Sequence, residues 1–248
     1  PTCSVKHQGL ETAPDLTMDG TTRKPSRLCY LWEAMLTAMQ DGMRTTDPAR
    51  AAAARPLGNA MEDLGAAIRA YLAGLDPDTA NQLEMERAED ILAFCTQLLH
   101  AEDIVERSLV PMVQKMARQR IVLPPALMAP VERMLTQLGY NLNICATVLL
   151  GQTPPEGNPL AGQKDLFRDL ESDATAAYFE RLRTSSAEAK TPAETAEAVM
   201  QEETATYQLT LLRDLRRVNT HIVAAASYPL TPGDGPLFVE HEATNAAP

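Results

Sequence analysis

The stretch from residue 88 to residue 116 carries a repeat that strongly limits what this chain can fold into. Its apolar residues are separated by alternating steps of three and four, which places them along one face of an α-helix. A repeat held over this length is typical of the contact between neighbouring helices of a bundle. It also includes one carboxylate, Glu102, among residues that should face a core. The positions are Ala88, Ile91, Cys95, Leu98, Glu102, Val105, Leu109, Met112 and Met116.

Five further segments have helical periodicity or helix-boundary signals, and no segment alternates with period two for long enough to predict a strand. Asp47-Pro48 is a helix start, with a capping acid followed by proline in the first turn. Pro56 and Pro111 predict a break or a kink inside the second and third helices. We therefore expect an all-α fold of six helices, arranged as two tandem three-helix bundles with no sheet. The expected helices span 27–45, 48–75, 79–119, 126–150, 162–184 and 192–227.

The order of the helices repeats along the chain, which predicts an internal duplication. When the first half is laid on the second, polar residues fall on matched positions of the apolar stripe. The matched pairs are Leu98 with Leu215, Glu102 with Asn219, and Val105 with Ile222. We expect a disordered lead-in over 1–26, a first three-helix bundle over 27–120, a second over 121–229 and a flexible tail over 230–248.

Charge and composition narrow the possible partners. The net charge is −11 over 248 residues, and a surface this acidic repels nucleic acid and anionic lipid. Aromatic residues make up only 4%, so aliphatic and methionine side chains must fill the core. No two cysteines form a CxxC pair, which favours buried free thiols in a reducing compartment over a disulfide framework. The cysteines are Cys3, Cys29, Cys95 and Cys145.

Targeting and membrane signals are weak. The first residues, PTCSVKHQGLETAPDLT, lack the long apolar segment of a signal peptide. The chain starts with proline and not methionine, which favours a fragment or a processed product. The longest uncharged run, from Met134 to Pro155, is interrupted by four amide side chains. We therefore expect no direct membrane insertion of this segment.

Three stretches resemble a known family. AEDILAFCTQLLHAEDIVERSL (88–109), LLRDLRRVNTHIVAAASYPL (211–230) and AIRAYLAGL (67–75) are similar to helices of PhoU-like domains, more narrowly the cytoplasmic C-terminal domain of bacterial sodium–phosphate cotransporters. The likeness runs from about Met35 to Leu230. It implies two three-helix bundles, a non-catalytic regulatory role in phosphate transport, and no cofactor. It also implies a soluble domain at the cytoplasmic face of the inner membrane, whose partner is the membrane-embedded part of the transporter or a second copy of itself.

Many PhoU-like proteins bind metal clusters through an E/DxxxD motif in each half. The resemblance places those acids at positions 99, 103, 216 and 220, which here are Leu99, Asp103, Arg216 and Thr220. Hard cations need several converging oxygen ligands, and an arginine at a ligand position repels them. We expect no metal of the family type, with Asp103 as the single remaining candidate ligand.

One candidate site is the acidic cluster of Glu102, Asp103 and Glu106, with His100 nearby. Glu102 and Glu106 share a helix face at i,i+4, whereas His100 and Asp103 project elsewhere. The cluster could hold a metal or perform acid–base chemistry. The favoured hypothesis is a partly solvated Glu102 at the edge of the helix contact, paired with an arginine of another helix, because an unpaired buried carboxylate is costly. If Glu102 is buried, its pKa should be raised.

The second candidate site lies on the last helix and is basic. It could bind an anion or an acidic partner through guanidinium groups. The favoured alternative is an exposed polar face in which Arg217 pairs with Asp214 or with Glu102. Asn219 is expected to be a hydrogen-bonded core residue that fixes helix register. The cluster comprises Arg213, Arg216, Arg217, Asn219 and His221.

The sequence contains no GxSxG, P-loop or HExxH motif, so an enzyme is not expected. The expected function is a regulatory or interaction domain of a sodium-dependent phosphate transporter. Three alternatives stay open: a free-standing PhoU-type regulator of phosphate uptake that binds metal, a helical-bundle enzyme that uses Glu102 as an acid–base group, and a purely structural bundle.

Overall fold

The computed structural model describes residues 20–74, 82–149, 160, 162–188 and 192–226. Within these ranges every regular element is a helix and no strand occurs, which confirms the all-α prediction. Two breaks divide what are otherwise six continuous rods, as predicted. The elements are α1 (Gly20–Thr45), α2 (Pro48–Ala52), α3 (Ala54–Ala73), α4 (Gln82–Ile104), the π-helix η1 (Val105–Leu109), α5 (Val110–Gln119), α6 (Pro125–Leu149), α7 (Gln163–Glu188) and α8 (Pro192–Ala225).

The predicted boundaries at the two ends of the chain can be compared with the structure only in part. The expected disordered lead-in and flexible tail fall mostly on residues 1–19 and 227–248, outside the described residues. The first helix begins at Gly20, earlier than the predicted helix start at residue 27. Hydrophobic periodicity marks the buried part of a helix, and the hydrogen-bonded backbone continues beyond that part.

The second rod is broken close to where Pro56 predicted. Asp47 caps α2, because its Oδ1 accepts a hydrogen bond from the backbone N–H of Ala49 at 2.9 Å. α2 then ends after Ala52 and α3 starts at Ala54. Pro56 thus lies in the first turn of α3, where a missing N–H removes no helical hydrogen bond.

The third rod widens into a π turn where a kink was predicted. The turn spans Val105–Leu109 and is followed at once by α5, whose second residue is Pro111. Proline has no N–H, and its ring collides with the carbonyl one turn earlier. A π turn adds a residue to the turn and so relieves this clash. The rod ends at Arg120, whose left-handed φ of 56° closes the helix.

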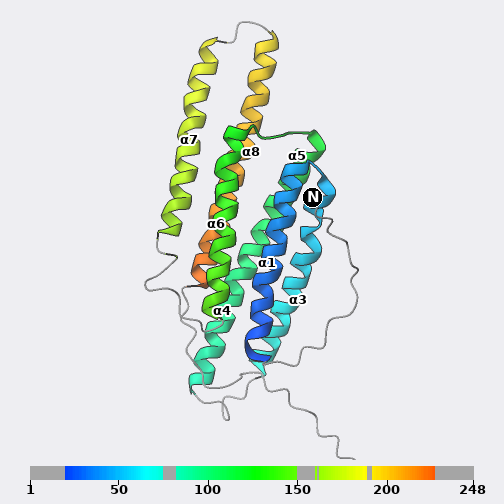
Figure 1. Ribbon diagram of the computed structural model, residues 1–248, viewed down its shortest axis with the longest axis vertical. Coiled ribbons are helices and arrows are strands. Elements are labelled where there is room, and N and C mark those ends of the chain that lie inside the picture. The colour runs from blue at the N-terminus through cyan, green and yellow to red at the C-terminus, as the bar shows by residue number, and fades with distance from the viewer. Residues whose placement is uncertain (1–19, 75–81, 150–159, 161, 189–191, 227–248) are drawn as a thin grey trace, which may run out of the picture.

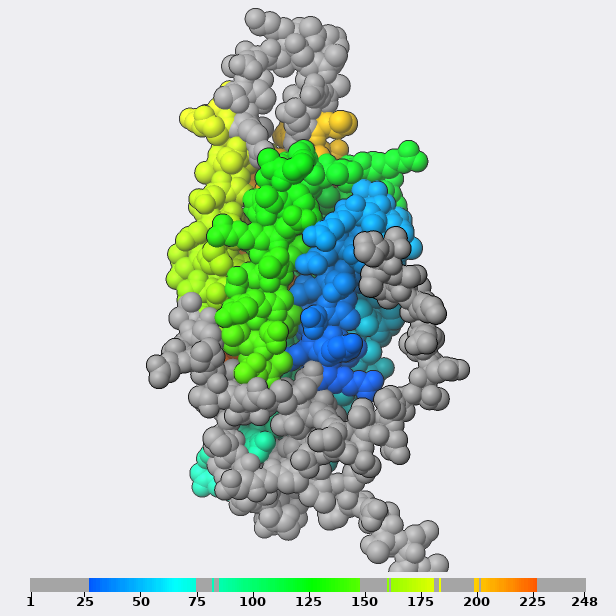
Figure 2. Space-filling view, viewed as in Figure 1, coloured from blue at the N-terminus to red at the C-terminus, as the bar shows by residue number. Residues whose placement is uncertain are grey.

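Four central helices, α1, α4, α6 and α8, hold the core, with α3 packed on α1 and α4 and α7 packed on α8. Figure 1 shows α3 and α7 at opposite edges, and the α7–α8 end extends beyond the other helices. In the space-filling view α6 lies between α7 and α1 (Figure 2). α4 and α8, the last helices of the two predicted bundles, pack extensively on each other. The buried side chains of both halves therefore form one continuous cluster.

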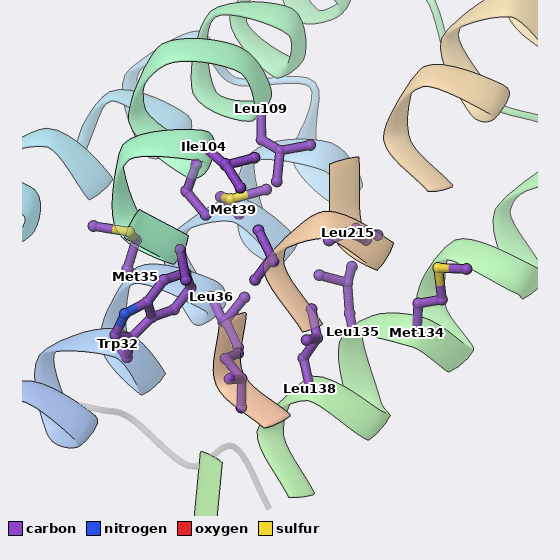
Figure 3. Close-up of a cluster of buried hydrophobic side chains, with 14 of the residues drawn as sticks. Trp32, Met35, Leu36, Met39, Ile104, Leu109, Met134, Leu135, Leu138 and Leu215 are labelled. Carbon is purple, nitrogen blue, oxygen red and sulfur yellow. The ribbon is translucent and has the colours of Figure 1, made fainter. Parts of the chain in front are cut away.

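The core is built mainly from aliphatic and methionine side chains, as the low aromatic content predicted, and its largest fully buried members are Trp32, Phe94 and Phe167. Figure 3 shows side chains of α1 in this core, together with residues of the third rod, α6 and α8. The indole N–H of Trp32 donates to the carbonyl of Leu98 at 3.0 Å. The apolar stripe of the third rod is buried apart from Met112, which is half-buried, so the heptad prediction is confirmed. Among the described helices, none contains a stretch that is long and apolar enough to cross a bilayer.

Candidate functional site

Glu102 lies in the interior of the protein, between α3 and α4. Only 2% of the surface of this residue is exposed to solvent. The Oε1 atom is buried and has no hydrogen-bond partner, and no salt bridge reaches Glu102 within the described part of the chain. The favoured prediction of a partly solvated, arginine-paired carboxylate is therefore wrong. The sequence pattern placed Glu102 on the buried stripe correctly, and the helix contact excludes water there.

Gly58 of α3 makes room for this carboxyl group. A Cβ built on Gly58 would lie 2.5 Å from Oε1 of Glu102 and 3.4 Å from the terminal methyl carbon of Met35. Because glycine has no side chain, the backbone of α3 can approach the carboxyl group closely. Two turns later, a Cβ on Gly65 would lie 2.5 Å from Cδ1 of Leu99. At these two glycines, the surface of α3 has no side chain, and the side chains of Glu102 and Leu99 from α4 pack against its backbone.

Two further carboxylates complete the site, which we call the acidic trio: Glu62 of α3, Glu102 of α4 and Glu106 of η1. One carboxylate oxygen of each lies within 4.8 Å of the other two. Glu62 is exposed, Glu106 is half-buried and Glu102 is buried, so the trio runs from solvent into the interior. The predicted shared face of Glu102 and Glu106 is confirmed. Glu62 was missed, although residues 58, 62 and 65 share a helix face by their spacing.

The surroundings of Glu102 raise its pKa from 4.5 to about 7. Burial is the largest cause, because it disfavours the charged form. The negative charges of Glu106, Glu62 and Asp103 raise the pKa further, and Arg107 opposes them. At neutral pH the group is therefore divided between its protonated and ionised forms, and a small change of environment shifts the balance.

Asp103 does not belong to the trio. Its Oδ1 lies 2.5 Å from Nε of Arg107, one turn along the rod, and both side chains are substantially exposed. At the other family metal positions, Leu99 packs toward Gly65 and Arg216 pairs with Glu171 of α7 at 2.8 Å. Thr220 donates its hydroxyl hydrogen to a backbone carbonyl. The four positions thus offer a single carboxylate, which is already ion-paired.

The arginines of the basic cluster are paired with carboxylates of the protein. Arg213 and Arg217 lie 3.6 Å and 3.3 Å from Oδ1 of Asp214, so the predicted pairing of Arg217 with Asp214 is confirmed. Asp214 is 1% exposed on its side chain, and its other oxygen accepts a hydrogen bond from Ser108 of η1. These contacts join α8 to the π turn. Anion binding by the cluster stays a prediction.

His221 and Asn219 have structural partners. His221 Nδ1 lies 2.9 Å from Oε1 of Gln97, and its ring packs edge-on against His100 with centroids 5.5 Å apart. Burial, His100 and Arg217 lower the pKa of His221 below 6.5, which favours the neutral ring at pH 7. Asn219 is fully buried and accepts a hydrogen bond from Nδ2 of Asn141 at 2.7 Å. The prediction of a hydrogen-bonded core asparagine is confirmed.

The alternative of a Glu102-based enzyme requires a pocket at this carboxyl group. A surface cavity of about 170 Å³ lies between α1 and α6, lined by residues that include Cys29, Glu33 and Asn143. Glu102 does not line it. Cys29, Cys95 and Cys145 are buried free thiols, as predicted, and burial raises the pKa of Cys29 and Cys95 to about 12. These thiols therefore lack the exposure and the thiolate fraction that a cysteine nucleophile requires.

Fold and site together define an all-helical bundle protein with polar groups at its helix–helix contacts. No protein-family model matches the chain. Among curated proteins it is 24% identical over 213 residues to the "Putative inorganic phosphate export protein YjbB" of Salmonella typhimurium LT2, and to the proteins of the same name from Escherichia coli O157:H7 and K12. Each match covers 86% of this chain and 37% of the relative. The chain thus spans little more than a third of the length of these relatives.

Proposed function

We propose that this chain is a non-catalytic interaction and regulatory domain that acts in phosphate transport. The observation that carries the proposal is the match to three proteins named for phosphate export, which covers 86% of this chain but 37% of theirs. A segment that matches one part of a larger protein over nearly its whole length is typical of a domain. The proposal does not depend on the direction of phosphate movement.

The finer assignment is a PhoU-like domain of a sodium–phosphate transporter, on the cytoplasmic face of the inner membrane. It is supported by the resemblance of residues 88–109 and 211–230 to PhoU-like helices and by the six-rod fold. A non-catalytic role is supported by the ion-paired state of the arginines of α8 and by the buried thiols. A free-standing metal-binding regulator is the second candidate, which the acidic trio favours.

The partner we propose is the membrane-embedded part of the transporter or a second copy of this chain. Large apolar side chains are exposed on α7 and α8, the two helices whose shared end extends beyond the others in Figure 1. Phe179 is 59% exposed, Val199 is 59% exposed and Met200 is 67% exposed. Exposed apolar groups of this size gain free energy when a partner covers them. We call the surface formed by Phe179, Val199 and Met200 the α7–α8 extension.

The test is a phosphate-flux measurement in the native host. Cells that carry Phe179→Asp together with Met200→Asp are loaded with radioactive phosphate, and uptake and efflux are compared with wild type. We expect the flux to change while the abundance and helicity of the protein stay the same. Tyr30→Asp is the matched control, because Tyr30 is 72% exposed on α1, outside the extension. Unchanged flux in cells that lack the whole chain would contradict the role in phosphate transport.

A further inference from the structure

The acidic trio brings three carboxylates together without a neutralising partner at its buried end. Glu102 is 2% exposed, and its Oε1 has no hydrogen-bond donor within the described residues. Burial of an unpaired carboxylate costs several kcal/mol. The nearest cation on the same rod, Arg107, already holds Asp103 at 2.5 Å. The site therefore has the negative charge and the unused oxygen that a positive ligand would satisfy.

The geometry suits a small ion. Oxygens bound to one Ca²⁺, Mn²⁺ or Mg²⁺ lie at about 2.0–2.6 Å from the metal, so two of them are separated by at most about 5 Å. One carboxylate oxygen of each residue of the trio already lies within 4.8 Å of those of the other two. Glu62 is exposed and Glu106 is half-buried, so the site is open to ions from solvent at these two residues.

The trio lies between a π turn, which carries Glu106, and a glycine position on the facing helix α3. Glu106 belongs to the π turn, which follows directly after the end of α4. π turns are frequent at functional sites, where the extra residue alters the direction of side chains. On the facing helix, Gly58 leaves the space that the Glu102 carboxyl group occupies. A larger residue at position 58 would fill the buried end of the site.

We propose that Glu62, Glu102 and Glu106 bind a hard divalent cation of the Mg²⁺, Mn²⁺ or Ca²⁺ class between α3 and the α4–η1 junction. An all-carboxylate set selects such ions over soft metals, which prefer thiolate and imidazole. The site uses none of positions 99, 103, 216 and 220. It does not rest on the function proposed above. Bound cation would join α3 to the third rod and offset the negative charge inside the bundle.

The test is titration of the metal-free 248-residue chain with Mn²⁺, followed by calorimetry and by the paramagnetic resonance signal of free Mn²⁺. We expect one ion per chain with a dissociation constant below about 1 mM. Glu62→Gln should weaken binding by about tenfold or more. Because Glu62 is exposed, this variant removes a ligand without disturbing the core. Glu89→Gln, which changes an exposed carboxylate of α4 outside the trio, is the matched control and should leave the affinity within about twofold.

Two results would overturn the proposal. One is a wild-type chain that shows no saturable Mn²⁺, Mg²⁺ or Ca²⁺ binding at pH 8. The other is binding that Asp103→Asn abolishes and Glu62→Gln leaves intact, which would place the ion at the family position. A second measurement guards against loss of fold in Glu102→Gln. Mn²⁺ should raise the melting temperature of the wild-type chain and should leave that of a folded Glu102→Gln variant unchanged.

Discussion

The Oε1 atom of Glu102 lies 2.5 Å from the point where a Cβ of residue 58 would stand, so the carboxyl group keeps its position only because residue 58 is Gly58. The same helix repeats the arrangement at Gly65, where the atom that a Cβ would meet is Cδ1 of Leu99. One glycine therefore faces a polar group of the acidic trio, and the other faces an apolar side chain. Substitutions at the two glycines therefore distinguish an effect on the acidic trio from an effect on helix packing.

Gly58→Ala should weaken divalent-cation binding although it removes no carboxylate. The added methyl group must push the Glu102 carboxyl group away, because real Cβ atoms essentially never approach another atom this closely. Displacement of one ligand of three should reduce the affinity for Mn²⁺ by about tenfold. The free energy of unfolding should change little, since alanine gains about 0.5–1 kcal/mol over glycine inside a helix and the clash offsets that gain. Calorimetric titration and urea unfolding measure the two quantities.

Gly65→Ala is the matched control for this experiment. It places the same methyl group on the same face of α3, against Leu99 and not against Glu102. The affinity for Mn²⁺ should stay at the wild-type value, and any loss should appear in stability alone. Equal weakening of binding by both variants would show that α3 as a whole had moved, and would remove the support that Gly58 gives to the site.

Glu102→Gln should flatten the pH dependence of stability in the absence of divalent cations. The pKa of Glu102 is about 7 in the folded chain against 4.5 ordinarily, because of burial and of Glu106, Glu62 and Asp103, with Arg107 opposing. Between these pH values the folded state holds the proton and the unfolded state releases it. Stability contributed by the neutral carboxyl is thus present at low pH and is lost as pH rises to about 7. The loss is at most about 3 kcal/mol, and the neutral amide should abolish it.

Urea unfolding at pH 5 and pH 8, in the presence of a chelator, measures this difference. The emission of Trp32, the only tryptophan of the chain and fully buried, reports the transition. Glu89→Gln is the control, because it changes an exposed carboxylate on the same helix. The quantity to compare is the difference in unfolding free energy between the wild-type chain and Glu102→Gln. If this difference is the same at pH 5 and at pH 8, the carboxyl group titrates as it does in water.

Most of the fold is predictable from the sequence because local signals determine it. The apolar spacing from Ala88 to Met116 fixed the buried face of the third rod, and Pro56 and Pro111 marked the two breaks. The form of the second break was not predictable. A proline can kink a helix or widen it into a π turn, and the packing of neighbouring helices decides between them.

The site was predictable only where its parts share one helix. Glu102 and Glu106 were paired by their spacing, whereas Glu62 lies on another helix and enters through the packing of α3 on α4. The solvation of Glu102 was predicted wrongly for a related reason. Whether an arginine reaches a buried carboxylate depends on tertiary contacts, and the arginines of α8 pair with Asp214 and Glu171 instead.

The three described cysteines should be almost inert to thiol reagents while the chain is folded. Cys29, Cys95 and Cys145 are buried, and burial raises the pKa of Cys29 and Cys95 to about 12. Only the thiolate reacts, and its fraction at pH 8 is then about one in 10,000. The rate of modification by an aromatic disulfide should therefore follow unfolding. A Cys3→Ser background removes the one cysteine outside the described residues. Rapid labelling of this variant under native conditions would contradict the buried state of the thiols.

Asn141 and Asn219 should be coupled in stability, because their side chains form a 2.7 Å hydrogen bond inside the bundle. Both residues are fully buried, so removal of one partner leaves one group of the other amide unpaired. Without Asn219, the NH2 group of Asn141 loses its acceptor while its oxygen still accepts from Gln137. Without Asn141, the oxygen of Asn219 loses its donor while its NH2 group still donates to the carbonyl of Gln163. Asn141→Leu or Asn219→Leu alone should cost about 1–3 kcal/mol. The double variant should cost less than the sum of the two by about 1 kcal/mol, since neither amide is then left unpaired.

A double-mutant cycle measured by urea unfolding tests this coupling. In the predicted duplication of the chain, Asn219 of the second half is matched with Glu102 of the first. The asparagine has a side-chain partner on the neighbouring helix, whereas Oε1 of Glu102 has none among the described residues. If the polar stripe position is retained for helix register, the asparagine pair should show coupling with or without divalent cations. Glu102→Gln should then change stability in a cation-dependent way. Additive single variants at Asn141 and Asn219 would instead show that the hydrogen bond contributes nothing beyond packing.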